Sequence, residues 1–156
     1  MDLNPDWREF FESFEKHEVE FMVVGALALA CHGHPRLTGD LDVWIRPTAH
    51  NASRVLVALQ EFGVGSLTVS TNDLTSDDAV PQIGYPPRRI DLLTFATGVS
   101  FEDAWSRKVT MPFGTLNVPV IGKQDLIVNK RSTGRLQDLA DAAALEGEAN
   151  DGSNAD

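Results

Sequence analysis

Two acidic residues separated by one position, Asp40 and Asp42, are the strongest chemical signal in the sequence. The segment 40–45 alternates in polarity, which predicts a β-strand that carries both acids on one face. Adjacent carboxylates repel one another unless a cation lies between them, and carboxylate oxygens suit Mg²⁺ and Mn²⁺. The pair therefore indicates a divalent-cation site. The alternative is an ordinary solvated strand face, because the motif is short.

Residues of the kinds that bind phosphate precede this acidic pair. A predicted strand ends at Gly25, and the turn through Gly25 and Ala26 leads into a helix, where backbone N–H groups can approach a phosphate. Arg36 and Thr38 lie just before the acids, and an arginine can bind phosphate oxygens through two parallel hydrogen bonds. The alternatives are an ordinary strand-to-helix turn at Gly25 and plain loop residues at Arg36 and Thr38.

The elements that must position these residues follow from periodicity and turn signals. Helices are predicted to start at Pro5 and Ser100 and to span Ala26–Cys31, Thr48–Phe62, Lys123–Arg131 and Arg135–Glu146. Strands are predicted over Val19–Val24, Asp40–Ile45, Arg89–Thr94, Lys108–Met111 and Thr115–Val120, with Ile83–Tyr85 pairing to Arg89–Thr94. The segment Ser66–Val80 is interpreted as a loop with a short helical turn.

This mixed order of helices and strands predicts an α/β or α+β fold, a small mixed sheet with helices packed on it. The length of 156 residues fits one domain over residues 1–146. Residues 147–156 are acidic and poor in apolar side chains, which predicts a disordered tail.

The charge balance restricts the class of substrate. Thirteen Lys and Arg face 23 Asp and Glu, which gives a net charge of -10. Because nucleic-acid affinity comes largely from phosphate neutralisation by basic residues, a long RNA or DNA substrate is disfavoured. Small nucleotides that bind through metal ions remain compatible with this charge.

The sequence favours a cytoplasmic protein that does not enter a membrane. The longest apolar stretch, Phe21–Cys31, is too short to cross a bilayer and contains Gly25. The first residues lack the basic-then-apolar order of a secretory signal. The single cysteine, Cys31, cannot form an internal disulfide, and we expect a reduced thiol.

Two blocks of the sequence together resemble the polymerase-beta-type nucleotidyltransferase superfamily. The first block is VVGA at 23–26 followed by HGHPRLTGDLDV at 32–43, and the second is KQDLIVNKR at 123–131 followed by RLQDLAD at 135–141. They are similar to the glycine turn, the His-Gly-x-x-Arg-x-Thr loop, the Asp-hydrophobic-Asp strand and the C-terminal helix pair of that family. The branch with the best correspondence is that of the small relatives of the abortive-infection nucleotidyltransferase toxins. The resemblance implies a nucleotidyltransferase-like fold and transfer of a nucleoside monophosphate from a nucleoside triphosphate with Mg²⁺ or Mn²⁺.

The resemblance also implies a third metal-binding acid. The paired acids of the family fall on Asp40 and Asp42, and its later acid, set between hydrophobic residues, matches Asp91. Two divalent ions carry four positive charges and need further oxygen ligands, which is the physical purpose of a third acid. The alternative is a strand-end acid paired with Arg88 or Arg89. Rival acids in the polar loop are Asp73, Asp77 and Asp78.

In the second block, the resemblance implies that Lys130 contacts the triphosphate of the nucleotide. The alternative is a solvated helix lysine. Arg135 and Asp138 are three residues apart, as in a surface ion pair on a helix, and Asp138 and Asp141 are expected to shape the helix pair.

Some features depart from the family pattern. Ala26 occupies a position where many active relatives have Gly or Ser, and the chain lacks the additional helical region of the tRNA-modifying toxins. The missing helical region and the acidity both disfavour an RNA substrate, so the expected acceptor is a hydroxyl on a protein or small molecule. The resemblance also implies a role in a toxin–antitoxin pair. The alternative function is a non-catalytic antitoxin or regulatory partner that binds a basic toxin through its acidic surface.

Overall fold

A six-stranded mixed sheet forms the centre of the molecule, which we describe from a computed structural model covering residues 4–35, 38–63, 69–77, 80–84 and 88–154. The strand order is β3-β4-β2-β1-β6-β5. In chain order the strands are β1 (Phe21–Val24), β2 (Asp40–Ile45), β3 (Gln82–Ile83), β4 (Arg89–Leu93), β5 (Val109–Phe113) and β6 (Leu116–Val120). The prediction of a mixed sheet with helices packed on it is confirmed.

The strand β2 lies in the middle of the sheet and carries the paired acids. It runs antiparallel to β1 and parallel to β4. The register places Asp42 opposite Asp91 and Asp40 opposite Arg89. Strand pairing therefore brings together two segments that lie about fifty residues apart in the sequence.

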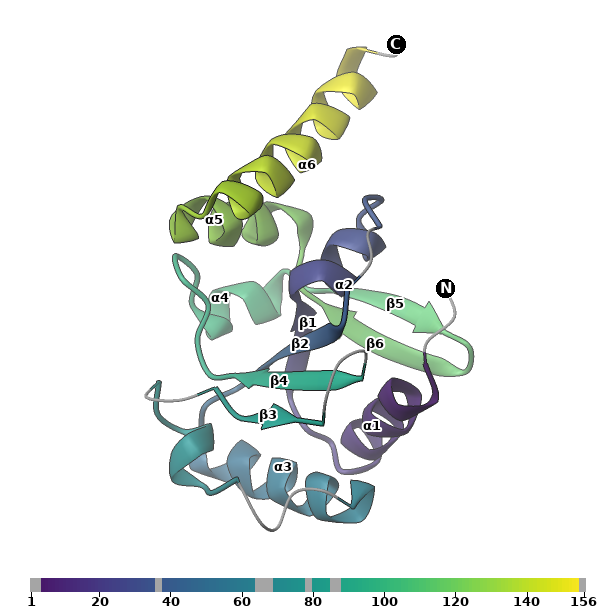
Figure 1. Cartoon of the computed structure of the whole chain (residues 1–156), viewed down its shortest axis with the longest axis vertical. Coiled ribbons are helices and arrows are strands. Elements are labelled where there is room, and N and C mark those ends of the chain that lie inside the picture. The colour runs from purple at the N-terminus through teal and green to yellow at the C-terminus, as the bar shows by residue number, and fades with distance from the viewer. Residues whose placement is uncertain (1–3, 36–37, 64–68, 78–79, 85–87, 155–156) are drawn as a thin grey trace.

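One face of the sheet is covered by α1 (Pro5–Lys16) and α3 (Ala49–Phe62), which lie side by side in Figure 1. The side chain of Asn4 accepts a hydrogen bond from the backbone of Trp7 and so caps α1. Phe11 and Phe14 of α1 are fully buried and pack on Phe21 of β1, with ring centroids 5.9 and 5.3 Å apart respectively. This apolar layer makes the face a continuous core.

The opposite face carries the acids and is covered by α2 (Gly25–Cys31), α4 (Phe101–Ser106), α5 (Lys123–Thr133) and α6 (Leu136–Asn154). Trp44, on the same face of β2 as the acids, packs edge-to-face on Phe101 at 5.2 Å. The helices α5 and α6 pack against each other above this face (Figure 1). The only helical turn in the described part of the 66–80 segment is a 3-10 helix at Asn72–Leu74, as predicted.

The predicted elements occur in the predicted order, and the differences lie at their ends. The strand predicted to begin at Val19 begins at Phe21, because Glu18 adopts a left-handed conformation with φ 55° just before it. The last helix continues to Asn154, beyond the predicted end at Glu146 and into the acidic tail that we predicted to be disordered. Among the described helices, none has the length and apolar character needed to cross a bilayer.

Candidate functional site

Three carboxylates converge at the centre of the sheet. Asp40, Asp42 and Asp91 each place an oxygen within 4.8 Å of the oxygens of the other two, and they are the only such acidic cluster among the described residues. Oxygens bound to one divalent ion lie at most about 5 Å apart, since metal–oxygen distances are 2.0–2.6 Å. The three acids can therefore hold a divalent cation together. The prediction that Asp91 lies beside the paired acids is confirmed in position.

A cationic side chain of the protein already lies among these acids. Arg89 donates a hydrogen bond of 2.8 Å to Asp40 and one of 3.3 Å to Oδ2 of Asp91. Its Nε atom lies 3.1 Å from Oδ1 of Asp91 as an ion pair, yet neither atom has a hydrogen-bond partner. Oδ1 of Asp91 therefore lies buried beside Arg89 without a hydrogen bond, so the protein does not fully satisfy this carboxylate. Sequence reasoning treated pairing with Arg89 and metal binding as alternatives, whereas the structure places both groups together.

Electrostatics within the cluster raises two carboxyl pKa values. Burial first, and then the charges of Asp91 and Asp40, raise the pKa of Asp42 to about 6. Burial also raises the pKa of Asp91, and Arg89 opposes that rise. A cation placed among the acids would stabilise their charged forms, so a raised pKa is the result expected for a cation site without its ion.

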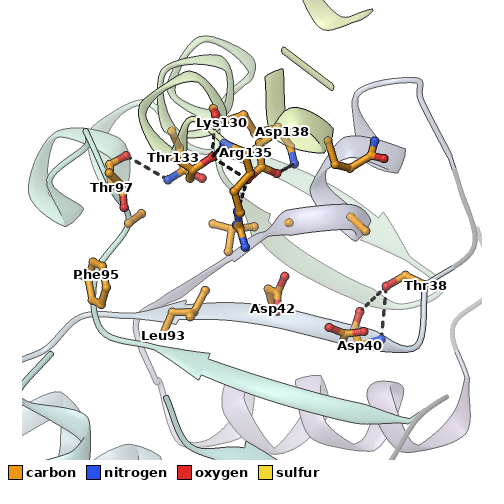
Figure 2. A pocket seen from close by; sticks show the side chains of 16 residues that line it. Thr38, Asp40, Asp42, Leu93, Phe95, Thr97, Lys130, Thr133, Arg135 and Asp138 are labelled. Carbon is orange, nitrogen blue, oxygen red and sulfur yellow. Dashed lines mark hydrogen bonds and ion pairs between the residues drawn. The ribbon is translucent and has the colours of Figure 1, made fainter. Parts of the chain in front are cut away.

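Two acids of the cluster, Asp40 and Asp42, line a pocket of about 440 Å³, the size range of small-molecule sites, whereas Asp91 lies beside them outside the pocket lining. Asp40 and Asp42 lie along one wall, and the opposite wall includes Lys130 of α5 and Arg135, which lies between α5 and α6 (Figure 2). Gly25, Ala26 and Thr38, all predicted to bind phosphate, also line the pocket. Arg36 lies outside the described residues.

Gly25 is required for the close approach of α2 to the acids. Its φ is 66°, in the left-handed region that favours glycine. A Cβ atom at this position would lie 2.2 Å from Oδ2 of Asp42 and 3.0 Å from its carboxyl carbon. The absence of a side chain therefore allows the strand-to-helix turn and the carboxylate to occupy adjacent space.

Replacing Gly25 by Ala is expected to lower the free energy of unfolding by more than the 1–2 kcal/mol typical of a left-handed non-glycine residue. The additional cost comes from displacing the carboxylate of Asp42, so cation affinity should fall as well. Gly114→Ala is a matched control, because Gly114 has φ 63° and nothing within 4 Å of the added Cβ. Chemical denaturation and calorimetric cation titration of both variants measure the difference. If Gly25→Ala and Gly114→Ala lost the same free energy of unfolding and the same cation affinity, a role for Gly25 in the site would be contradicted.

Two cationic residues on the opposite wall differ in their surroundings. Lys130 is 4% exposed, and its ammonium group pairs with Asp138 at 3.3 Å and with Asp141 at 2.9 Å. The side chain of Arg135 is 76% exposed and bonds Oδ2 of Asp138 through Nε at 2.8 Å, which leaves its terminal nitrogens directed into the pocket (Figure 2). Sequence reasoning correctly assigned Asp138 and Asp141 to shaping the helix pair. It missed the accessibility of Arg135, which depends on the packing of α6 on α5.

Other predicted residues have local partners. The hydroxyl of Thr38 donates to the carbonyl of Asp40 at 3.1 Å and accepts from its N–H, so Thr38 holds the start of β2. The rival acids Asp73 and Asp77 lie outside the cluster, and Asp73 accepts a hydrogen bond from the backbone of Ser70. Asp78 lies outside the described residues. His32 bonds the carbonyl oxygen of Ile121 at 2.8 Å.

Comparison with known proteins supports the fold. The sequence matches no protein-family model and no curated protein. The structure is similar to a crystal structure of a candidate nucleotidyltransferase from Thermotoga maritima, with a TM-score of 0.60 and 14% identity over 96% of each chain. At this identity the likeness concerns the fold alone. The chain therefore shares the fold of that candidate nucleotidyltransferase, and its acidic cluster can hold a divalent cation.

Proposed function

We propose that the protein is a metal-dependent nucleotidyltransferase that transfers a nucleoside monophosphate from a nucleoside triphosphate to a hydroxyl of a protein or small molecule. The observation that carries this proposal is the convergence of Asp40, Asp42 and Asp91 beside a pocket with cationic residues on its opposite wall. A site with acidic side chains alone suits a metal cation, and a site with cationic side chains alone suits an anion. A site with both suits a polyphosphate that arrives with divalent ions.

The reaction breaks one bond and forms one bond. The acceptor oxygen attacks the α-phosphorus, the bond between the α-phosphorus and the bridging oxygen breaks, and pyrophosphate leaves. Bound Mg²⁺ or Mn²⁺ would neutralise the phosphate charge and favour loss of the acceptor proton. We assign acceptance of that proton to the carboxylate of Asp91, which lies beside Asp40 and Asp42 in the acidic cluster. The contribution of the remaining residues is positioning and charge neutralisation.

Phosphate binding is assigned to the turn at Gly25 and Ala26, together with Thr38, Arg36 and Arg135. Gly25 and Ala26 adjoin Asp42 in the pocket, so a phosphate near the turn would also lie near the acidic cluster. The predicted contact between Lys130 and the triphosphate is reassigned to Arg135, because two acids already neutralise the Lys130 ammonium group.

Replacing Arg135 by Ala is expected to weaken binding of a nucleoside triphosphate about 10- to 100-fold, as loss of a hydrogen bond to a charged group does. Thermal stability should change little, because the side chain is exposed. Arg131→Ala is the matched control, since Arg131 is also exposed on α5 but pairs with Glu146 and does not line the pocket. Lys130→Met should instead destabilise the fold by about 3–5 kcal/mol, because two buried acids lose their partner. Calorimetric titration and thermal unfolding distinguish phosphate binding by Arg135 from the structural role of Lys130. Normal nucleotide affinity in Arg135→Ala would refute the assignment of phosphate binding to Arg135.

The net charge of -10 disfavours a nucleic-acid acceptor and supports a protein or small-molecule acceptor. The resemblance to abortive-infection toxins supports a place in a toxin–antitoxin pair, where the acidic surface would suit a basic protein partner.

The decisive experiment offers each α-³²P-labelled nucleoside triphosphate to the purified protein with cell lysate and Mn²⁺. We expect one class of molecule to become labelled, and the label to be absent when Asp91→Asn protein is used. Failure to bind cations or to label any molecule with any of the four nucleotides would reject the transferase. It would favour the non-catalytic partner.

A further inference from the structure

The pocket has an apolar end that the proposed chemistry does not use. Leu93, Phe95 and Ala96 line it where the chain leaves β4, beside the acidic wall (Figure 2). Phe95 is 48% exposed, whereas the other seven phenylalanines of the chain are buried or half-buried. Single exposed apolar residues are common on protein surfaces, so it is the location of the Phe95 ring in the lining of the pocket that points to a ligand.

The segment that carries Phe95 is held against α5. The backbones of Ala96 and Val99 form a β-bridge, and the side-chain amide of Asn129 in α5 donates to the carbonyl of Thr97 at 3.0 Å. Gly98 approaches α5 so closely that an added Cβ would lie 2.1 Å from the hydroxyl oxygen of Ser132. These contacts fix the turn that follows Phe95, so the backbone that carries the ring is preorganised beside the pocket.

We propose that Phe95 is the stacking platform for the nucleobase of the bound nucleoside triphosphate. This inference rests on the proposed function and assigns the base to the apolar end of the pocket, with the phosphates between the acidic cluster and Arg135. Every nucleobase has a flat π-face that stacks on an aromatic ring. A nucleotide, with an aromatic base at one end and a polyanion at the other, matches the apolar and charged ends of the pocket.

The composition of this end also predicts how selective it is. The side chains of Leu93, Phe95 and Ala96 offer no hydrogen-bond donor or acceptor to a base edge. Discrimination among bases requires such groups, because an unpaired polar group in the site penalises the wrong ligand. Stacking on Phe95 should therefore recognise the presence of a base, and any discrimination between bases would come from Thr97 and Asn129, the polar side chains that line the pocket beside this segment.

The test compares ligands with and without a base. The full chain with Mg²⁺ is titrated calorimetrically with the α,β-methylene analogues of ATP, GTP, CTP and UTP, which cannot be cleaved at the reacting bond, and with inorganic tripolyphosphate. In Phe95→Ala we expect affinity for all four analogues to fall about 5- to 150-fold, the range for one lost base stack. Tripolyphosphate affinity should be unchanged. Phe95→Trp should retain nucleotide affinity, and Val57→Ala, which alters a similarly exposed apolar residue outside this pocket, should have no effect.

Four results would overturn the assignment. Unchanged analogue affinity in Phe95→Ala, or an equal loss for the analogues and tripolyphosphate, would reject base stacking and leave the transferase proposal standing. Base stacking would also be rejected if the unaltered protein bound the nucleotide analogues no more tightly than tripolyphosphate. Absence of binding of every ligand to the unaltered protein would reject both the platform and the proposed function.

Discussion

Replacing both Asp40 and Asp42 by Asn is expected to abolish divalent-cation binding. The substitution keeps the size of both side chains but removes two of the three negative charges within 4.8 Å of one another. The remaining carboxylate, Asp91, is already paired with Arg89 and would compete poorly for a cation alone. Calorimetric titration with Mg²⁺ and Mn²⁺ measures the loss. The control removes the same charge at Asp73 and Asp77, outside the cluster, and should bind cations normally. Normal binding by the Asp40/Asp42 variant would refute the site.

The same variant should be more stable than the unaltered protein when no cation is present. The pKa of Asp42 is raised from 3.8 to about 6, so the folded state is penalised wherever this carboxyl is charged. The stability gained from a protonated Asp42 is complete below about pH 4 and is lost as the pH rises through 6. Asn does not titrate, and its advantage should therefore be greatest above pH 6.5, at most about 3 kcal/mol, and shrink as the pH falls toward 4. Thermal unfolding in EDTA at pH 5 and pH 8 gives this difference. A larger advantage at pH 5 would contradict the electrostatic explanation.

Replacing Asp91 by Ala is expected to reduce nucleotidyl transfer at least about 100-fold while the protein still folds. The change removes a metal ligand and the group assigned to accept the acceptor proton, and either loss has an effect of this size. Arg89 keeps its 2.8 Å hydrogen bond to Asp40, so the cluster retains one ion pair. Incorporation of α-³²P label, together with the midpoint of thermal unfolding, separates chemistry from stability.

Asp91→Asn distinguishes a catalytic role for Asp91 from a structural one. Asn has the same size and still accepts a hydrogen bond from Arg89, but it cannot accept a proton and is a weak metal ligand. A structural Asp91 would therefore be replaced successfully, with activity retained. If Asp91 is catalytic, as we expect, the Asp91→Asn variant should instead be as inactive as Asp91→Ala. Asp73→Ala and Asp77→Ala should retain activity, because neither acid belongs to the cluster.

Local sequence patterns determined most of the elements of this protein. The period of two over Asp40–Ile45 was sufficient to place both acids on one face, because successive side chains of a strand point to opposite sides. The helix Ala49–Phe62 was bounded by its own signals, since Thr48 accepts from the backbone of Asn51 and Gly63 adopts the left-handed C-cap conformation. In each case the physical cause acts within a few residues of the chain.

Tertiary structure decided which residues meet. The approach of Asp91 to Asp42 depends on the parallel register of β4 with β2, and a shift of one residue would turn Asp91 to the opposite face. The family resemblance therefore identified Asp91 as a candidate, but neither it nor the local sequence could bring Arg89 among the same acids. The burial of Lys130 between Asp138 and Asp141 and the exposure of Arg135 follow from the packing of α6 on α5. Phe95 drew no attention in the sequence, because an exposed and a buried phenylalanine are identical until the chain around them is folded.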